Sequence, residues 1–253
     1  MSRVIAIVNQ KGGVGKSTTA INLATYLAQQ GEKVLIADLD AQANATSGLG
    51  VSAGELGCMY DVLLDGKPLE EVAARTAIEG LHVAPSTINL VGAEVELVSE
   101  LAREFKLKRA LEKLPEGLYG RVLLDCPPSL DLLTLNALAA ADEVLIPIQC
   151  EYYALEGLTQ LMRSIRMVRE ELNPGLQIGG VLLTMFDTRT NLSHQVAEEV
   201  RSFFGERVFA AAIPRNVRLS EAPSFGQPIS LYAPQSAGAE AYSAVAGEVL
   251  SRG

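Results

Sequence analysis

The sequence contains no tryptophan, and aromatic residues make up only 5% of its 253 residues. Hydrophobic residues account for 48% of the chain and are therefore mainly aliphatic, so we expect an aliphatic core. Charged residues make up 20%, which beside this apolar content is typical of a folded chain rather than a disordered one. No repeat, linker or low-complexity tract divides the sequence. We expect one globular domain that spans residues 1–253.

Cysteine and histidine are also scarce, with three and two residues. Cys58, Cys126 and Cys150 are widely spaced and form no CxxC pair, so the sequence indicates neither a disulfide framework nor a zinc site. The chain shows no signal-peptide pattern and no apolar run of membrane-spanning length. A cytoplasmic protein in a reducing compartment is the simplest interpretation, with no membrane partner.

Positive charge is in deficit. Lysine and arginine number 21 against 30 acidic residues, which gives a net charge of −9. This balance argues against a protein covered in positive charge for wrapping nucleic acid. A local basic patch can still bind phosphates, particularly if dimerisation doubles it.

Short apolar runs rich in β-branched residues alternate with longer stretches of helical periodicity. The expected strands are 4–8, 34–37, 81–84, 122–124, 144–148 and 181–184. The expected helices are one that opens inside a glycine-rich loop and ends at Gly31, followed by 92–114, 133–140, 157–172 and 193–204. The strands are apolar almost throughout, as expected when both faces are buried. This pattern predicts an α/β fold with a mostly parallel, twisted sheet flanked by helices on both faces.

The glycine-rich loop follows the first expected strand and opens into the first expected helix. Backbone N–H groups and the positive end of a helix dipole then surround one anion, which predicts a phosphate cradle of the P-loop type. Lys16 is placed to reach the β and γ phosphates of a nucleotide, and the Ser17 hydroxyl to bind Mg²⁺. Gln10 stands where the general motif has its first glycine. The expected nucleotide-binding residues of the loop are Lys11, Gly12, Gly13, Val14, Gly15, Lys16, Ser17 and Thr18.

Carboxylates end two other expected strands. Asp38 and Asp40 follow the apolar run 34–37, and Asp125 follows the run 122–124 and precedes two prolines. Ligands of open α/β sheets bind at the carboxyl edge of the strands, so these side chains are expected near the phosphates. Asp125 matches a Walker B carboxylate on the metal side. The alternative for Asp38 and Asp40 is a helix cap or a turn.

The loop sequence KGGxGK[ST] resembles the deviant Walker A motif of the ParA/MinD family of ATPases. Three further segments, 41–50, 149–158 and 214–223, are similar to the chromosomal ParA (Soj) group of that family. The resemblance runs from Val4 to about Tyr242. One departure is Ala41 and Ala43, where relatives commonly carry proline and glycine.

The resemblance implies roles for individual residues. Lys11 would reach the nucleotide of a partner subunit and stabilise charge on its phosphates, and Asp40 would orient the attacking water. Asp38 would lie nearer the metal shell. Pro214 and Asn216 would contact the adenine, although the residues by themselves indicate only a polar loop. A solvated loop lysine is the alternative for Lys11.

The resemblance also implies an activity, an ATP hydrolase with weak intrinsic turnover that needs ATP and Mg²⁺. ATP would form a sandwich homodimer that binds double-stranded DNA without sequence preference. A ParB-type centromere-binding protein would stimulate hydrolysis and release, which implies chromosome or plasmid partitioning and a nucleoid-associated location. A replication initiator is a further possible partner. By family position the DNA contacts are Arg189 and Arg218, both in expected loops, where an ordinary surface arginine is the alternative.

Other functions within the fold remain open at this point. A MinD-like septum-placing ATPase needs a membrane-targeting helix, and the C-terminal residues 241–253 have no basic amphipathic face with bulky anchors. A nitrogenase reductase or iron–sulfur carrier needs paired cluster cysteines, and Cys126 has no suitably placed second cysteine. A third alternative is a DNA-bound regulator that acts by binding other factors rather than by moving DNA. The sequence does not distinguish this alternative from partitioning.

Overall fold

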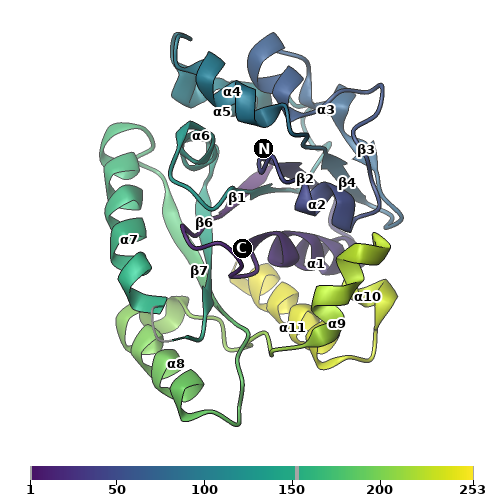
Figure 1. The fold of residues 1–253 in the computed structure, drawn as a ribbon. Helices are drawn as coiled ribbons and strands as arrows, with labels where there is room; N and C mark the ends of the chain where they lie inside the picture. Colours follow the sequence, from purple (N-terminus) through teal and green to yellow (C-terminus); the bar gives the residue numbers. More distant parts are fainter. Residues whose placement is uncertain (1, 152–153, 253) are drawn as a thin grey trace.

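The computed structural model describes residues 2–151 and 154–252 and contains a seven-stranded sheet (Figure 1). The strand order is β3-β4-β2-β5-β1-β6-β7, and every pair is parallel except β3 with β4. The strands are β1 (Arg3–Ile7), β2 (Val34–Asp38), β3 (Ala74–Arg75), β4 (Leu81–Ala84), β5 (Arg121–Asp125), β6 (Glu143–Gln149) and β7 (Gln177–Thr184). The predicted parallel sheet is confirmed, and the two-residue edge strand β3 is an addition to it.

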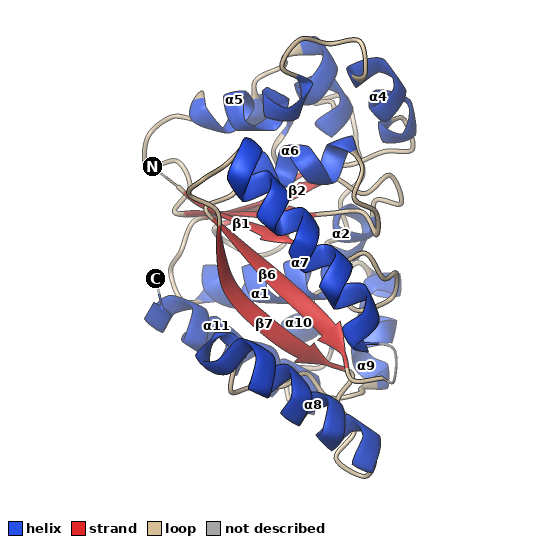
Figure 2. Cartoon of the chain, turned by 90° about the vertical axis from the view of Figure 1, so that its left-hand side faces the viewer, coloured by secondary structure: helices blue, strands red, loops and turns tan. Residues whose placement is uncertain are grey.

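Helices cover both faces of this sheet. They are α1 (Lys16–Gln29), α2 (Asn44–Gly48), α3 (Leu69–Val72), α4 (Leu90–Leu97), α5 (Lys106–Glu112), α6 (Leu132–Ala140), α7 (Ala154–Glu171), α8 (Asn191–Phe204), α9 (Val217–Glu221), α10 (Ile229–Tyr232) and α11 (Ala237–Arg252). Figure 1 places α1, α10 and α11 on one side of the sheet and α4, α5 and α6 on the other, and Figure 2 shows α7 crossing in front of β6.

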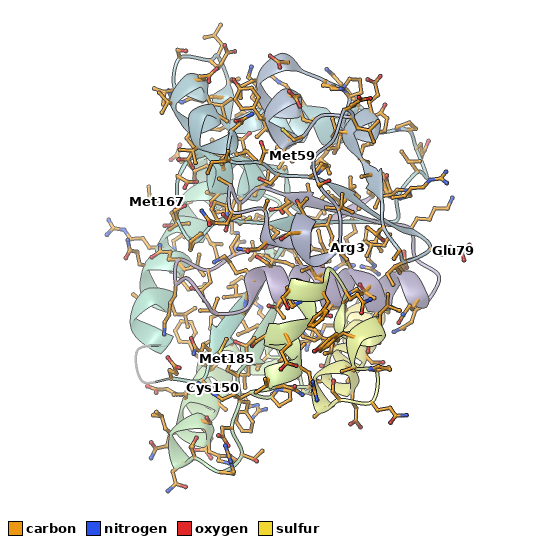
Figure 3. All side chains as sticks on the ribbon, turned by 45° about the vertical axis from the view of Figure 1, so that its right-hand side comes forward. Arg3, Met59, Glu79, Cys150, Met167 and Met185 are labelled. Carbon is orange, nitrogen blue, oxygen red and sulfur yellow. The ribbon has the colours of Figure 1, made fainter. Side chains whose placement is uncertain are left out.

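Alternate residues of each central strand enter different cores. Along β1, Val4 and Ala6 belong to the core beneath α4 to α8, whereas Ile5 and Ile7 belong to the core against α1 and α11. Successive strand side chains point to opposite faces, so a strand buried on both faces must be apolar at every position. This explains the continuous apolar runs of the sequence. Figure 3 contrasts Met59, enclosed with no exposed surface, with Met167, which is 56% exposed at the outer margin.

The predicted helix 92–114 is wrong as a single element. Helix α4 ends at Leu97, Ala102 takes a left-handed backbone with φ of 50°, and α5 begins only at Lys106. The cause lies on α6, where the buried Asn136 donates to the Arg103 carbonyl at 2.8 Å and accepts from the Leu107 N–H at 3.1 Å. These long-range hydrogen bonds satisfy backbone groups of the break that a continuous helix would have paired internally.

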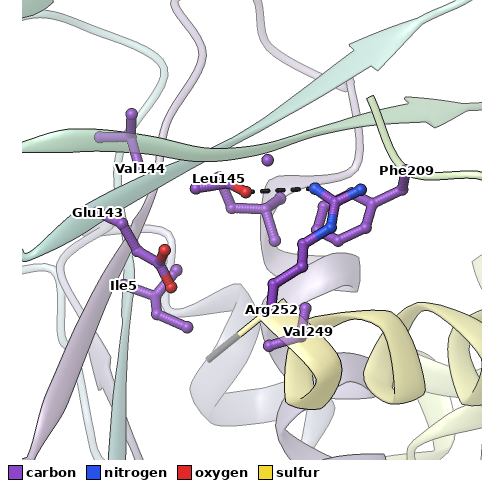
Figure 4. A pocket seen from close by; sticks show the side chains of 9 residues that line it. Ile5, Glu143, Val144, Leu145, Phe209, Val249 and Arg252 are labelled. Carbon is purple, nitrogen blue, oxygen red and sulfur yellow. Dashed lines mark hydrogen bonds between the residues drawn. The ribbon is translucent and has the colours of Figure 1, made fainter. Parts of the chain in front are cut away.

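The last quarter of the chain forms more helix than the sequence pattern predicted, including α9, α10 and α11. The Tyr242 side chain of α11 is 1% exposed, and its hydroxyl lies 3.1 Å from the Thr19 hydroxyl of α1. At the end of α11, Arg252 lies over the Phe209 ring at 4.2 Å and donates to the Gly179 carbonyl (Figure 4). Helix α11 is thereby held against α1 through Tyr242 and against β7 through Arg252. In the described ranges, no helix has the length and apolar character needed to cross a membrane.

Candidate nucleotide site

Three neighbouring strands end at one edge of the sheet and bring the predicted site residues together. Ile7, the last residue of β1, is in register with Asp125 of β5, and Asp125 is in register with Asp38 of β2. The phosphate loop leaves β1 at this edge and runs directly into α1. The parallel order of the strands therefore gathers carboxylates and loop lysines that are far apart in the sequence.

The conformation of the phosphate loop depends on its glycines and on a hydrogen bond from the end of strand β7. Gly13 and Gly15 have φ angles of 75° and 93°, a left-handed conformation that only glycine adopts without strain. The Val14 carbonyl accepts a hydrogen bond of 2.8 Å from the Thr184 hydroxyl at the end of β7. Helix α1 starts at Lys16, so the N–H groups of its first turn have no acceptor within the helix. This is the arrangement that a helix N-terminus and a glycine loop need to bind phosphate.

The two loop lysines lie in different environments. Lys16 is 7% exposed, its Nζ lies 3.4 Å from the Lys11 carbonyl, and burial lowers its pKa while the charges of Asp125 and Asp40 raise it. Lys11 is half exposed and pairs with the Glu151 carboxylate at 3.3 Å. Lys16 is therefore fixed inside the site, whereas Lys11 is held by an exposed ion pair that screening and exchange can break.

Asp125 has the chemistry of a cation-binding group. It is fully buried, and neither carboxylate oxygen forms a hydrogen bond of normal geometry in the described chain, although the Ser17 hydroxyl lies close enough to affect it. Burial first, and then the charge of Asp38, raise its pKa well above the usual value, while the Ser17 hydroxyl and Lys16 act in the opposite direction. A buried carboxylate without donors is costly unless a cation or proton neutralises it. Asp125 and Ser17 therefore fit a magnesium ion.

No cluster of three or more His, Cys, Asp or Glu side chains that could cage a metal occurs among residues 2–151 and 154–252. Mg²⁺ needs no such cage, because it keeps several waters and is commonly bound by one or two protein oxygens together with substrate phosphates.

Asp38 lies beside Asp125 but has partners within the chain. Its Oδ2 accepts from the Thr46 N–H and hydroxyl at 2.8 and 2.7 Å, and its Oδ1 accepts from the Asp40 N–H at 3.2 Å. Burial raises its pKa to about 6, and these hydrogen bonds oppose the rise. Asp40 is 9% exposed, and its Oδ1 accepts from the Gln42 N–H at 2.9 Å. The predicted metal-side role of Asp38 stays a prediction, while its loop contacts are a finding.

The predicted adenine residues lie beyond the end of β7. The Phe186 N–H donates to the Ile213 carbonyl at 2.9 Å, and the Arg215 N–H donates to the Phe186 carbonyl at 3.1 Å, so Pro214 is fixed against this strand end. Asn216 caps α9, because its side chain accepts from the Arg218 N–H at 2.8 Å. Pro214 also lines a hollow with Phe186. Contact with a base remains a prediction for both Pro214 and Asn216.

Comparison with known proteins agrees with this geometry. A family model described as an AAA domain matches residues 2–178. The sporulation initiation inhibitor protein Soj of Bacillus subtilis is 55% identical, with 100% of each chain covered. The chromosome partitioning protein ParA of Myxococcus xanthus is 54% identical over 100% of this chain and 89% of its own. The chain belongs to the ParA family.

The fold of this ParA-family chain also matches solved structures. Cobyrinic acid a,c-diamide synthase from Mycobacterium smegmatis with bound ADP and magnesium superposes with a TM-score of 0.86, at 39% identity, over 99% of this chain and 94% of that one. The expected family and the expected P-loop NTPase fold are thus confirmed. Tyr152 and Tyr153, part of segment 149–158 that carried the resemblance, lie outside the described residues.

The two predicted DNA-binding arginines of the ParA-family chain differ in setting. Arg189 is in a turn before α8, as expected, and its guanidinium donates to both oxygens of Asp187 at 2.9 and 2.8 Å. The loop predicted for Arg218 is wrong, because Asn216 caps a short helix there, and Arg218 pairs with Glu221 at 2.9 Å one turn later. Both guanidinium groups are exposed and held by local carboxylates.

Sequence reasoning missed three contributors to the site. Glu151 bridges the phosphate loop and the base-side segment, because it pairs with Lys11 at 3.3 Å and with Arg215 at 3.5 Å. Thr46 binds Asp38, and Thr184 holds the loop carbonyl of Val14. A signal existed only for Thr184, a polar residue that ends the apolar run 181–183.

Proposed function

We propose that this ParA-family protein is an ATP-dependent partitioning ATPase for a chromosome or plasmid, acting through residues 1–253 as one unit. The observation that carries the proposal is the fully buried Asp125, whose oxygens form no hydrogen bond of normal geometry in the described chain, beside the largely buried Lys16 at the mouth of a glycine loop. These charges suit a magnesium nucleotide, because phosphates pair with Lys16 and the cation neutralises Asp125. A relative named for chromosome partitioning is 54% identical in sequence over the whole of this chain, whereas the protein named as a synthase is 39% identical.

In this proposal the residues at the carboxyl edge of the sheet carry out ATP hydrolysis. The backbone N–H groups of residues 12–18 bind the phosphates, and Lys16 stabilises the charge that develops on them. Ser17 and Asp125 hold Mg²⁺, which neutralises phosphate charge when bound, and Asp38 supports this shell. Asp40, two residues beyond β2, positions the attacking water. Intrinsic turnover is weak in this proposal, since Lys11 is held by Glu151 within its own subunit.

A second subunit completes the site. Lys11 exchanges Glu151 for the phosphates of the partner subunit's nucleotide, so ATP binding and homodimer formation are coupled. Pro214 and Asn216 contact the adenine. This coupling makes the ATP-bound dimer the state that binds partners.

DNA binding and release follow from the dimer. Arg189 and Arg218 contact DNA phosphates without sequence preference, and pairing two subunits doubles these cations on a chain whose net charge is −9. A ParB-type centromere-binding protein stimulates hydrolysis, which returns the protein from DNA to the cytoplasm. Repeated cycles would distribute the ATPase over the nucleoid, with a replication initiator as a further partner.

The test combines oligomeric mass with DNA co-sedimentation. Wild type is compared with Gly12→Val, Asp40→Ala and Arg189→Glu in the presence of ATP and Mg²⁺, with ADP, and without nucleotide. We expect dimers on DNA only with ATP, accumulation of that state in Asp40→Ala, no dimer in Gly12→Val, and a dimer that carries several-fold less DNA in Arg189→Glu. Exposed Arg75 supplies the matched control, as Arg75→Glu on β3 changes charge equally. A monomer with ATP, or a dimer that binds liposomes and ignores DNA, would refute the proposal.

A further inference from the structure

The segment after β2 is closed into a loop by the side chain of Thr46. Thr46 lies in α2 and is 2% exposed. Its N–H and hydroxyl both donate to Oδ2 of Asp38, at 2.8 and 2.7 Å, while Oδ1 of Asp38 accepts from the Asp40 N–H at 3.2 Å. The carboxylate of Asp38 therefore binds both ends of segment 40–46.

The same hydroxyl links this segment to another strand. Oγ1 of Thr46 accepts a hydrogen bond of 3.0 Å from the N–H of Ser86, which follows β4, the neighbour of β2. Ser86 is 2% exposed, so this N–H has no access to solvent in place of Thr46. A hydroxyl donates once and accepts in addition, and Thr46 uses both capacities here.

Segment 40–46 contains a strained backbone position that these hydrogen bonds can stabilise. Ala43 has a left-handed backbone with φ of 52°, which is strained for a residue other than glycine. Asp40 is held by residues close to it in the chain, because its Oδ1 accepts from the Gln42 N–H and its carbonyl accepts from the Ala43 N–H. A strained loop persists where surrounding contacts fix it, and the fixed point here is the Asp38 carboxylate with Thr46.

We infer that Thr46 is a positioning residue that holds the Asp38 to Asp40 segment in the geometry required for ATP hydrolysis. The inference rests on the proposed ATPase function, because that function gives Asp40 its role. Thr46 acts through Asp38 and the backbone of Asp40. Removing its hydroxyl disconnects the segment from Ser86 and takes one of two Thr46 donors from Asp38.

The chain offers a matched control for that substitution. Thr25 is also a buried helical threonine, with no exposed surface, and its hydroxyl has no hydrogen-bond partner in the described part of the chain. Thr25→Val and Thr46→Val make the same chemical change in helices α1 and α2. Only Thr46→Val removes hydrogen bonds, while Thr46→Ser keeps the hydroxyl.

The experiment measures kcat and KM for ATP with Mg²⁺, together with hydrogen–deuterium exchange of the amides of residues 38–46 in nucleotide-free protein. For Thr46→Val we expect kcat to fall about tenfold or more, because displacing a reacting group slightly is costly, with KM changed less than about threefold. Amide exchange in 40–46 should rise. Thr46→Ser should restore both readouts, and Thr25→Val should match wild type in both.

Three outcomes separate the possibilities. If wild type hydrolyses ATP and Thr46→Val behaves like Thr25→Val in kcat and exchange, the positioning role is overturned. If Thr46→Ser fails to restore kcat and thermal stability falls in parallel, Thr46 is only a packing residue. If wild type does not hydrolyse ATP with DNA and a centromere-binding partner present, the proposed function fails. Exchange alone then decides whether Thr46 orders the segment.

Discussion

The carboxyl edge of the sheet and the surface around α8 and α9 hold their charged groups in opposite ways. At the edge, Asp125 is fully buried without a donor, and Lys16 is 7% exposed with one carbonyl contact of 3.4 Å. On the surface, the side chain of Arg189 is 84% exposed and pairs with Asp187. Burying an uncompensated charge is expensive, whereas an exposed ion pair contributes little. The charges at the edge are therefore expected to be neutralised by a ligand. The exposed arginines can exchange their carboxylate partners for other anions with little loss of stability.

The largest expected effect follows from removing the buried Lys16 side chain at the sheet edge. We expect Lys16→Ala to weaken ATP binding about 100-fold, since a hydrogen bond from a charged group in a site shielded from water contributes about 1.5–3 kcal/mol. Lys33→Ala, an exposed lysine just before β2, is the control and should bind as wild type does. Titration calorimetry with Mg²⁺ and ATP measures both. Similar affinities for the two variants would show that the buried lysine does not contact phosphate.

Asp125→Asn should change stability and nucleotide binding in opposite directions. Replacing a buried, unpartnered carboxylate by a neutral amide should raise the free energy of unfolding of the ligand-free protein at pH 8, by about 1–3 kcal/mol. The same change should raise the Mg²⁺ concentration needed for nucleotide binding about tenfold or more. Urea denaturation and binding titrations at several Mg²⁺ concentrations measure the two effects. A loss of stability instead would mean that Asp125 is satisfied inside the folded chain.

The pH dependence of stability gives a third test in protein free of metal and nucleotide. Burial raises the pKa of Asp38 to about 6, above the ordinary 3.8, so the folded state keeps a proton that the unfolded state has lost between these values. Stability is therefore highest below about pH 4 for this group and falls by up to about 3 kcal/mol as pH rises to about 6, since one pKa unit corresponds to about 1.4 kcal/mol. Asp38→Asn should flatten this fall in urea denaturation curves. An unchanged profile would contradict the raised pKa.

Sequence reasoning found the edge because its signals are local. Gly13, Gly15 and Lys16 sit at fixed spacing between a strand and a helix, and a parallel sheet necessarily gathers the strand-end residue Asp125 beside them. The break between α4 and α5 escaped prediction, since it depends on Asn136, some thirty residues later in the chain.

The surface around Arg218 shows a different limit. Asn216 is a strong N-cap residue, but a helix of five residues carries too little periodicity to be recognised from the sequence. Thr46 had no signal at all, because its role depends on the meeting of β2 and β4 through Asp38 and Ser86.

The smallest expected effects concern the surface arginines. Arg189→Glu and Arg218→Glu should each weaken DNA binding several-fold at about 0.1 M salt and lower the salt dependence by about one unit of slope per subunit, as loss of one phosphate contact in each subunit predicts. The guanidinium of Arg189 must leave Asp187 to reach a phosphate, so Asp187→Asn should tighten DNA binding about two- to threefold. Arg75→Glu on β3 controls for net charge in fluorescence anisotropy titrations. If Arg75→Glu weakened binding as much as Arg189→Glu, only the overall charge would matter, and the surface would not form a DNA site. If Asp187→Asn weakened binding, Asp187 would orient Arg189 toward DNA rather than compete with it.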